Sequence, residues 1–143
     1  MKIWFLLPLI LIFIDQFSKK FVLGGFRYKL GFFEITLVYN EGSAFGFKIF
    51  KNHEYILINS ILLILFSIFI FYKSRNNSLK NFYFLSLTLI ISGGIGNIID
   101  RILYGKVVDF ISFYNFPVFN FADSFITVGF IIFVICIFID SRN

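Results

Sequence analysis

The chain has 143 residues, of which 59% are hydrophobic and only 15% are charged, and its formal net charge is +5. Soluble domains average about 45–50% apolar and about 25% charged residues, so a single soluble core would leave too few polar residues to cover its surface. Aromatic residues make up 22% of the chain, which excludes an intrinsically disordered protein. The composition therefore predicts one domain, embedded in a lipid bilayer.

Four apolar segments are each near the length of about 20 residues that a helix needs to cross a bilayer. We predict a bundle of four transmembrane helices within a single domain, 1–143, with the helices at about 3–23, 55–72, 82–103 and 121–139. The first segment could also be a cleaved signal peptide. No small-residue cleavage site follows its apolar run, so we interpret it as a retained helix.

The loop between the first two predicted helices, about residues 24–54, has a different pattern. Phe33, Ile35, Leu37 and Tyr39 occupy alternate positions, which is typical of a β-strand. Glycines interrupt this segment at several points and indicate turns. We therefore predict a small β-sheet in the first loop, lying on the membrane surface, and short connections between the remaining helices.

Successive transmembrane helices alternate in direction, so the first loop, the third loop and the helix ends next to them share one face of the membrane. The polar residues that map to this face are Asp15, Asn40, Asn97, Asp100, Arg101, Asp109, Asn120 and Asp123. The distribution of basic residues does not decide which face is cytoplasmic, because lysines and arginines occur in the short second loop and also around the first loop.

Ionisable residues within membrane helices are candidates for function, because burying them in lipid is costly. Asp15 and Lys19 are four residues apart and suit a helical ion pair, which could serve a site or let the helix end near the headgroups. Asp100 lies beside Arg101 and could pair with it. The glycines at 93, 94 and 96 favour close approach of another helix.

Asp109 and Asp123 form the most informative pair, because they lie fourteen residues apart on the same predicted face. Two carboxyl groups brought together do not both ionise readily, so one keeps a proton while the other can activate water. This is the basis of aspartic peptidase chemistry, which needs no metal or other cofactor. As alternatives, Asp123 could cap the fourth helix and Asp109 could be a turn residue.

Other functions remain open at this point. A single histidine and a single cysteine do not support a His/Cys metal site. A cluster of aspartates could hold Mg²⁺ near lipid phosphates, as in a metal-dependent phospholipid-modifying enzyme. A small transporter is the non-enzyme alternative, although it would place its carboxylates near the bilayer midplane. The basic residues suit anionic lipid headgroups, so we expect membrane lipids rather than nucleic acid as partners.

Five motifs occur in order along the chain: DQFSK (Asp15 to Lys19), NEGSAFG (Asn40 to Gly46), GGIGNIIDR (Gly93 to Arg101), VVDF (Val107 to Phe110) and FNFADS (Phe119 to Ser124). Together they resemble the bacterial lipoprotein signal peptidase (signal peptidase II) family over essentially the whole chain. The resemblance implies an intramembrane aspartic endopeptidase of the bacterial cytoplasmic membrane. Its substrates would be prolipoproteins, which the family cleaves just before a cysteine that carries diacylglyceryl.

The resemblance also assigns roles to residues. Asp109 and Asp123 would be the catalytic dyad, and Asn40, Arg101 and Asn120 would hold the substrate backbone or position the dyad. The residues that would support the same site are Asp15, Lys19, Asn97 and Asp100. Both termini would be cytoplasmic and the active site would face the outer leaflet, which makes the β-rich loop extracytoplasmic. We expect a monomer, with Phe45 and Phe47 of the first loop closing over the lipid or peptide.

Overall fold

Helices and strands make up most of the chain that the structure describes. The computed structural model describes residues 3–41, 52–74 and 78–142. In chain order the elements are α1 (Ile3–Leu23), β1 (Tyr28–Leu30), β2 (Phe33–Asn40), α2 (Asn52–Ser74), α3 (Lys80–Tyr104), β3 (Val107–Phe113), β4 (Phe116–Phe119) and α4 (Phe121–Asp140). Helices thus occupy the four predicted segments, with ends that differ from the predicted ones by up to three residues.

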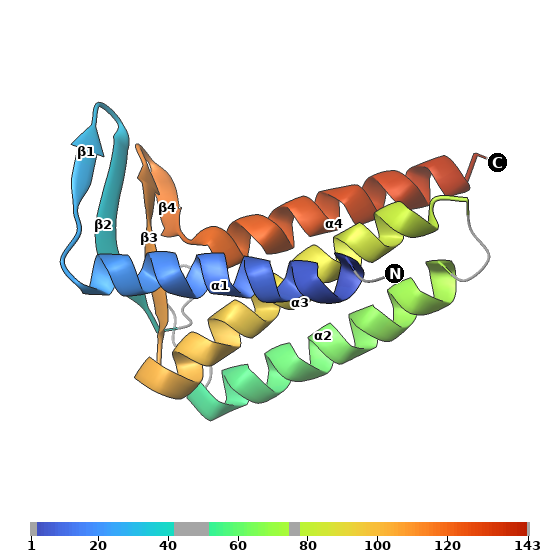
Figure 1. Ribbon diagram of the computed structural model, residues 1–143, viewed down its shortest axis with the longest axis horizontal. Coiled ribbons are helices and arrows are strands. Elements are labelled where there is room, and N and C mark those ends of the chain that lie inside the picture. The colour runs from blue at the N-terminus through green and yellow to red at the C-terminus, as the bar shows by residue number, and fades with distance from the viewer. Residues whose placement is uncertain (1–2, 42–51, 75–77, 143) are drawn as a thin grey trace.

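The helices lie side by side with α3 at the centre, in contact with α1, α2 and α4 (Figure 1). The sheet crosses the end of the bundle where α1 and α3 end and α4 begins. At the other end, Tyr83 of α3 is buried and its hydroxyl donates to Asp140 Oδ2 of α4 at 2.6 Å. One end of the bundle therefore carries the sheet, and the other end closes on an apolar core around Tyr83.

Glycines let α3 approach its neighbours closely. A Cβ atom at Gly93 would lie 2.3 Å from the Ala122 carbonyl oxygen of α4, and one at Gly96 would lie 2.6 Å from Asp15 Oδ2 of α1. Neither distance is compatible with a side chain, so backbone and carboxylate occupy the space that a side chain would fill. The glycines of this motif therefore allow close helix packing, as the sequence indicates.

The sheet predicted in the first loop is present as β1 and β2, but the prediction that the sheet is confined to this loop was wrong. The sheet is antiparallel with strand order β1-β2-β3-β4, and β3 and β4 come from the connection between α3 and α4, which we expected to be a short loop. Residues 107–110 are buried on both faces of β3, so their sequence shows no alternation of polar and apolar residues. Asp109 accordingly lies within a strand and not in a turn.

Large apolar side chains are exposed on all four helices, for example Phe13 of α1, Leu62 of α2, Ile102 of α3 and Phe130 of α4. Exposed apolar surface of this extent marks a surface that lipid or another apolar partner covers. Among the described residues, α3 and α4 are long and apolar enough to cross a membrane. The chain thus has four helices, two of them apolar candidate spans, and a small sheet at one end.

We expect Gly93→Ala to lower the free energy of unfolding by about 1–3 kcal/mol, the usual cost of forcing extra atoms into a packed core. The clash would be with the Ala122 backbone, which cannot move without displacing α4. Gly94→Ala is the matched control, because its Cβ would meet only the flexible end of Leu63. Thermal unfolding in detergent micelles checks this, and an equal loss in both variants would contradict it.

Candidate active site

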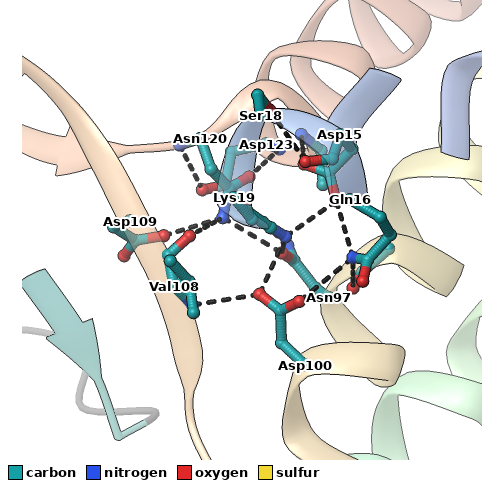
Figure 2. A network of polar contacts seen from close by, with 12 residues as sticks. Asp15, Gln16, Ser18, Lys19, Asn97, Asp100, Val108, Asp109, Asn120 and Asp123 are labelled. Atoms are coloured by element: carbon teal, nitrogen blue, oxygen red, sulfur yellow. Dashed lines mark hydrogen bonds and ion pairs between the residues drawn. The ribbon is translucent and has the colours of Figure 1, made fainter. Parts of the chain in front are cut away.

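Polar residues gather where the sheet meets the ends of α1 and α3 and the start of α4 (Figure 2). Asp123 is half-buried, and the buried members of the cluster are Asp15, Lys19, Asn97, Asp100, Asp109 and Asn120. In the described chain no buried side-chain nitrogen or oxygen lacks a hydrogen-bond partner. Burial of so many satisfied polar groups in so apolar a chain marks a functional site.

Asn120 and Asp123 begin α4 with a reciprocal pair of hydrogen bonds. The Asn120 side-chain oxygen accepts from the backbone N–H of Asp123 at 2.9 Å, and Asp123 Oδ2 accepts from the backbone N–H of Asn120 at 3.2 Å. This is a capping box, in which Asn120 is the N-cap and Asp123 is the third helical residue. Capping engages Asp123 Oδ2, while Oδ1 accepts from Asn97 Nδ2 at 2.8 Å.

Asp109 faces the start of α4 from the middle of β3. Its Oδ1 accepts a hydrogen bond from Asn120 Nδ2 at 2.7 Å, and its Oδ2 accepts one from Asn40 Nδ2 at 3.0 Å. Asn40 ends β2, which pairs with β3. Because its side-chain nitrogen donates to the Asp109 carboxyl group and its backbone N–H donates to the Asp123 carboxyl group, Asn120 fixes the two carboxyl groups relative to one another.

Burial and charge act together on Asp109. Its removal from water raises the pKa of the carboxyl group to about 6, and the nearby negative charge of Asp123 adds to this effect. The hydrogen bonds from Asn40 and Asn120 act in the opposite direction, because they stabilise the carboxylate. The Asp109 carboxyl group can therefore hold a proton near neutral pH. The neighbouring carboxyl group of Asp123 lies at a helix N-terminus, where negative charge is favoured.

A buried ion triad lies behind the two aspartates. Lys19 Nζ lies 2.8 Å from Asp15 Oδ2 and 2.8 Å from Asp100 Oδ2, and it donates to Asn97 Oδ1 at 3.2 Å. The predicted pair of Asp15 and Lys19 is present. The sequence left open a pair between Asp100 and its neighbour Arg101, and the structure shows Asp100 in an ion pair with Lys19 on another helix.

The triad also holds backbone groups of the surrounding elements. Asp15 Oδ1 accepts from the backbone N–H of Ala122 at 2.9 Å, and Asp100 Oδ2 accepts from that of Val108 at 3.0 Å. These bonds connect α1 to the start of α4 and α3 to β3. The charged residues thus position β3 and α4, the strand and the helix that carry Asp109 and Asp123.

Gln16 belongs to this cluster, although the sequence analysis did not select it. Its Nε2 donates to Asp100 Oδ1 at 3.0 Å and to the Gly96 carbonyl at 3.1 Å. The available signal was its place inside the DQFSK motif, between Asp15 and Lys19. An amide adjacent to a buried aspartate in a membrane helix also needs a partner, and the nearest polar surface is α3.

Arg101 lies in the last turn of α3. It is half-buried, and its Nη1 donates to the Asn97 carbonyl at 3.3 Å. It lies at one end of an apolar groove of about 500 Å³ between α2, α3 and α4. The residues that line this groove are Leu62, Leu63, Phe66, Ile90, Gly94, Asn97, Arg101, Ile126 and Phe130. An apolar segment in the groove would meet a guanidinium and an amide at this polar end.

The cluster is poorly suited to a divalent cation. The carboxylates of Asp15 and Asp100 both contact the Lys19 ammonium, whose positive charge would repel a metal ion. Within residues 3–41, 52–74 and 78–142, no group of three or more His, Cys, Asp or Glu side chains is arranged to hold a metal. Phe45 and Phe47, which we expected to close over the substrate, lie outside the described residues.

Comparisons with known proteins agree on one family. The profile of the family described as Signal peptidase (SPase) II matches residues 7–139. A lipoprotein signal peptidase of Burkholderia vietnamiensis (strain G4 / LMG 22486) is 42% identical over 88% of this chain and 81% of its own length. One of Burkholderia ambifaria (strain MC40-6) is 39% identical over 92% of this chain and 84% of its own length.

A solved structure is similar to the whole fold. A bacterial membrane enzyme determined by the in meso method at 2.3 Å resolution superposes with a TM-score of 0.86 and 32% sequence identity. The alignment covers 100% of this chain and 92% of that one. The fold described above is therefore that of a known membrane enzyme.

We expect the Asp109 carboxyl to titrate near pH 6, protonated below that value and ionised above it. Asp123→Asn should shift the titration to lower pH, because it removes the neighbouring negative charge. Asn40→Ala should shift it to higher pH, because it removes a donor that stabilises the carboxylate. Carbon-13 NMR of labelled aspartate in micelles checks both directions, and shifts of the same sign would contradict the assignment.

Proposed function

The chain belongs to the signal peptidase II family, and on that premise we propose that it cleaves the signal peptide from diacylglyceryl-modified prolipoproteins just before the lipidated cysteine, with Asp109 and Asp123 as its catalytic dyad. The observation that carries the assignment of the dyad is Asn120, whose side-chain nitrogen donates to the Asp109 carboxyl group and whose backbone N–H donates to the Asp123 carboxyl group. The catalytic residues are carboxyl groups alone, so the reaction uses no cofactor.

The different environments of Asp109 and Asp123 support different roles for them in catalysis. Asp109 holds the proton, since its pKa is raised by burial and by Asp123. Asp123 is the base: it takes a proton from water while the water oxygen attacks the scissile carbonyl carbon. Asp109 gives its proton to the carbonyl oxygen, which forms a neutral diol. When the diol collapses, one hydroxyl returns its proton to Asp109 as the C=O bond re-forms, the C–N bond breaks, and the departing amine takes the proton from Asp123.

The apolar groove supports a binding site for the signal peptide. It lies between α2, α3 and α4, and Asn97, which donates to Asp123, is part of its lining. An apolar peptide segment there would bring its polar end to the dyad. Arg101 at the same end carries five N–H donors suited to peptide carbonyls, and Asn40 lies against Asp109 from the sheet. We assign these two residues to holding the substrate backbone.

We propose that all four helices cross the bacterial cytoplasmic membrane, with both termini cytoplasmic and the dyad at the outer leaflet. The start of α1 and the end of α4 lie at the end of the bundle away from the sheet (Figure 1). α1 carries Asp15 and Lys19, but these charges are buried against α3 and paired, so they do not contact lipid. The single domain covers residues 1–143, and the monomer contains all members of the dyad and its supports.

The side chains on the outer part of the sheet support the proposal that the sheet lies flat on the membrane. Directly opposed residues of antiparallel strands share a face, and the register aligns Leu30, Phe33, Phe113 and Phe116 in one row across all four strands. The neighbouring row of Lys29, Glu34 and Ser112 faces the other way. One face of the sheet is therefore apolar and the other polar.

The apolar face is the one that carries Asp109. Alternate residues of a strand point the same way, so Phe113 and Ile111 lie on the same face of β3 as Asp109. Asp109 faces α4, so this face is directed towards the helices and the surrounding lipid. We propose that Leu30, Phe113 and Phe116, which are all at least half exposed, rest on the outer leaflet.

The dyad is tested by cleavage of a diacylglyceryl-modified precursor in micelles. We expect Asp109→Asn and Asp123→Asn each to reduce the rate by about 10³-fold or more, the scale of general acid–base catalysis. Glu34→Gln, which alters an exposed carboxyl group on the sheet, is the control and should retain the rate.

The same assay separates the competing functions. The unlipidated precursor should not be cleaved, and a chelator should leave cleavage unchanged. Cleavage by both aspartate variants would exclude the dyad. Loss of activity with the chelator would favour a metal-dependent enzyme instead.

The position of the sheet is tested with tryptophan at adjacent residues in a Trp4→Phe background, which removes the one native tryptophan. We expect Leu30→Trp fluorescence to be blue-shifted and quenched by brominated lipids, because its side chain would contact acyl chains. Lys29→Trp, on the opposite face, should be quenched by aqueous iodide instead. Equal quenching at both positions would contradict the proposed orientation.

A further inference from the structure

We infer that Lys19 is a positioning residue for catalysis: its buried ammonium fixes the orientation of the Asn97 amide, so that Asn97 presents an N–H donor to Asp123. The inference rests on the proposed role of Asp123 as the base. Lys19 would act without touching the substrate, because it is only 1% exposed.

The argument begins with the chemistry of the Asn97 amide. Its oxygen and nitrogen are nearly equal in size, so the two orientations of the group fill the same space, and neighbouring charges choose between them. An ammonium group only donates hydrogen bonds. Lys19 Nζ therefore requires the amide oxygen at 3.2 Å, and the amide nitrogen must point the other way, where it meets Asp123 Oδ1 at 2.8 Å (Figure 2).

Asn120 gives weaker support to the same orientation. Its Nδ2 also donates to Asn97 Oδ1, at 3.1 Å. That nitrogen has two hydrogens and three acceptors, of which Asp109 Oδ1 is the nearest at 2.7 Å and the Val108 carbonyl is the third. Lys19 brings a full charge to the same oxygen and is the stronger determinant of how the amide lies.

Lys19 itself has no freedom to turn away from Asn97. Asp15 on its own helix and Asp100 on α3 hold the ammonium at 2.8 Å each, and Asn97 accepts the remaining donor. All donors of the ammonium are then occupied. A cation on the oxygen of an amide also polarises its N–H groups, which strengthens the bond to Asp123.

The consequence for catalysis is specific. Without the donor from Asn97, Asp123 Oδ1 would lose its fixed position. Removal of Lys19 should therefore lower kcat, with little change in KM.

A double-mutant cycle tests the route through Asn97, with the diacylglyceryl-modified precursor as substrate. We expect Lys19→Met and Asn97→Ala each to lower kcat by about 10- to 100-fold, the range seen when a partner that orients an active group is removed. The double variant should be no slower than Asn97→Ala alone, because Lys19 would then have nothing to orient. Multiplied losses would show that Lys19 acts independently of Asn97 and would overturn the inference.

Two further variants separate positioning from folding. Tyr83→Phe removes one buried hydrogen bond at the far end of the bundle and should lower the unfolding temperature without altering kcat. Asn97→Asp keeps both the shape of the side chain and an acceptor for Lys19, but it has no donor for Asp123. It should lose activity even if Lys19→Met does not fold, and an Asn97→Asp enzyme with wild-type kcat would overturn the inference.

The wild-type enzyme distinguishes this inference from the proposed function. A wild type that does not cleave the lipidated precursor would reject the proposed function. A wild type that cleaves it, an inactive Asp109→Asn variant, and a Lys19→Met variant with wild-type kcat would reject the role of Lys19 alone.

Discussion

The ion triad of Asp15, Lys19 and Asp100 is the interaction on which the rest of the structure depends. It joins α1 to α3 inside the bundle, and its carboxylates bind the backbone of Ala122 and Val108, where α4 and β3 carry the two aspartates. Removing one partner of a buried ion pair usually costs about 3–5 kcal/mol, because the other charge is left unpaired. Such a linkage ties the geometry of the site to the packing of the bundle.

Close packing and buried charge depend on each other in this protein. Gly96 leaves room for Asp15 to reach α3, and Gly93 brings α3 against the first turn of α4. A larger residue at either position would separate the groups that the ammonium holds together. The small residues of the GGIGN motif are therefore part of the site, although none of them has a side chain to offer.

The two carboxyl groups of the dyad occupy different electrostatic environments. Asp109 is buried in β3, where the sheet meets the bundle, and burial disfavours its charged form. Asp123 is half-buried in the first turn of a helix, where backbone N–H groups and the helix dipole favour a negative charge. A strand and a helix thus place the same residue type in two environments that suit the proposed acid and base, and Asn120 contacts both carboxyl groups.

Much of the site was predictable from sequence because its residues lie in ordered motifs. Asp109, Asp123 and the three asparagines at 40, 97 and 120 lie together in the structure, while their roles in catalysis stay a proposal. The helices followed from the length of their apolar runs, which is a local property. Gln16 was missed because its partners on α3, Gly96 and Asp100, lie 80 and 84 positions away along the chain. No local pattern reports contacts at that separation.

The sequence by itself determined where the helices form and which residues are polar in an otherwise apolar chain, because hydrophobic length and composition are properties of each segment alone. Only the tertiary structure decided that β3 and β4 complete the sheet, since a strand buried on both faces has no alternating pattern and acquires its partners by long-range pairing. It also decided that Asp100 binds Lys19 on α1. The Lys19 ammonium is buried between α1 and α3 and needs a second carboxylate besides that of Asp15. After folding, that carboxylate belongs to Asp100, which is far from Lys19 in the sequence.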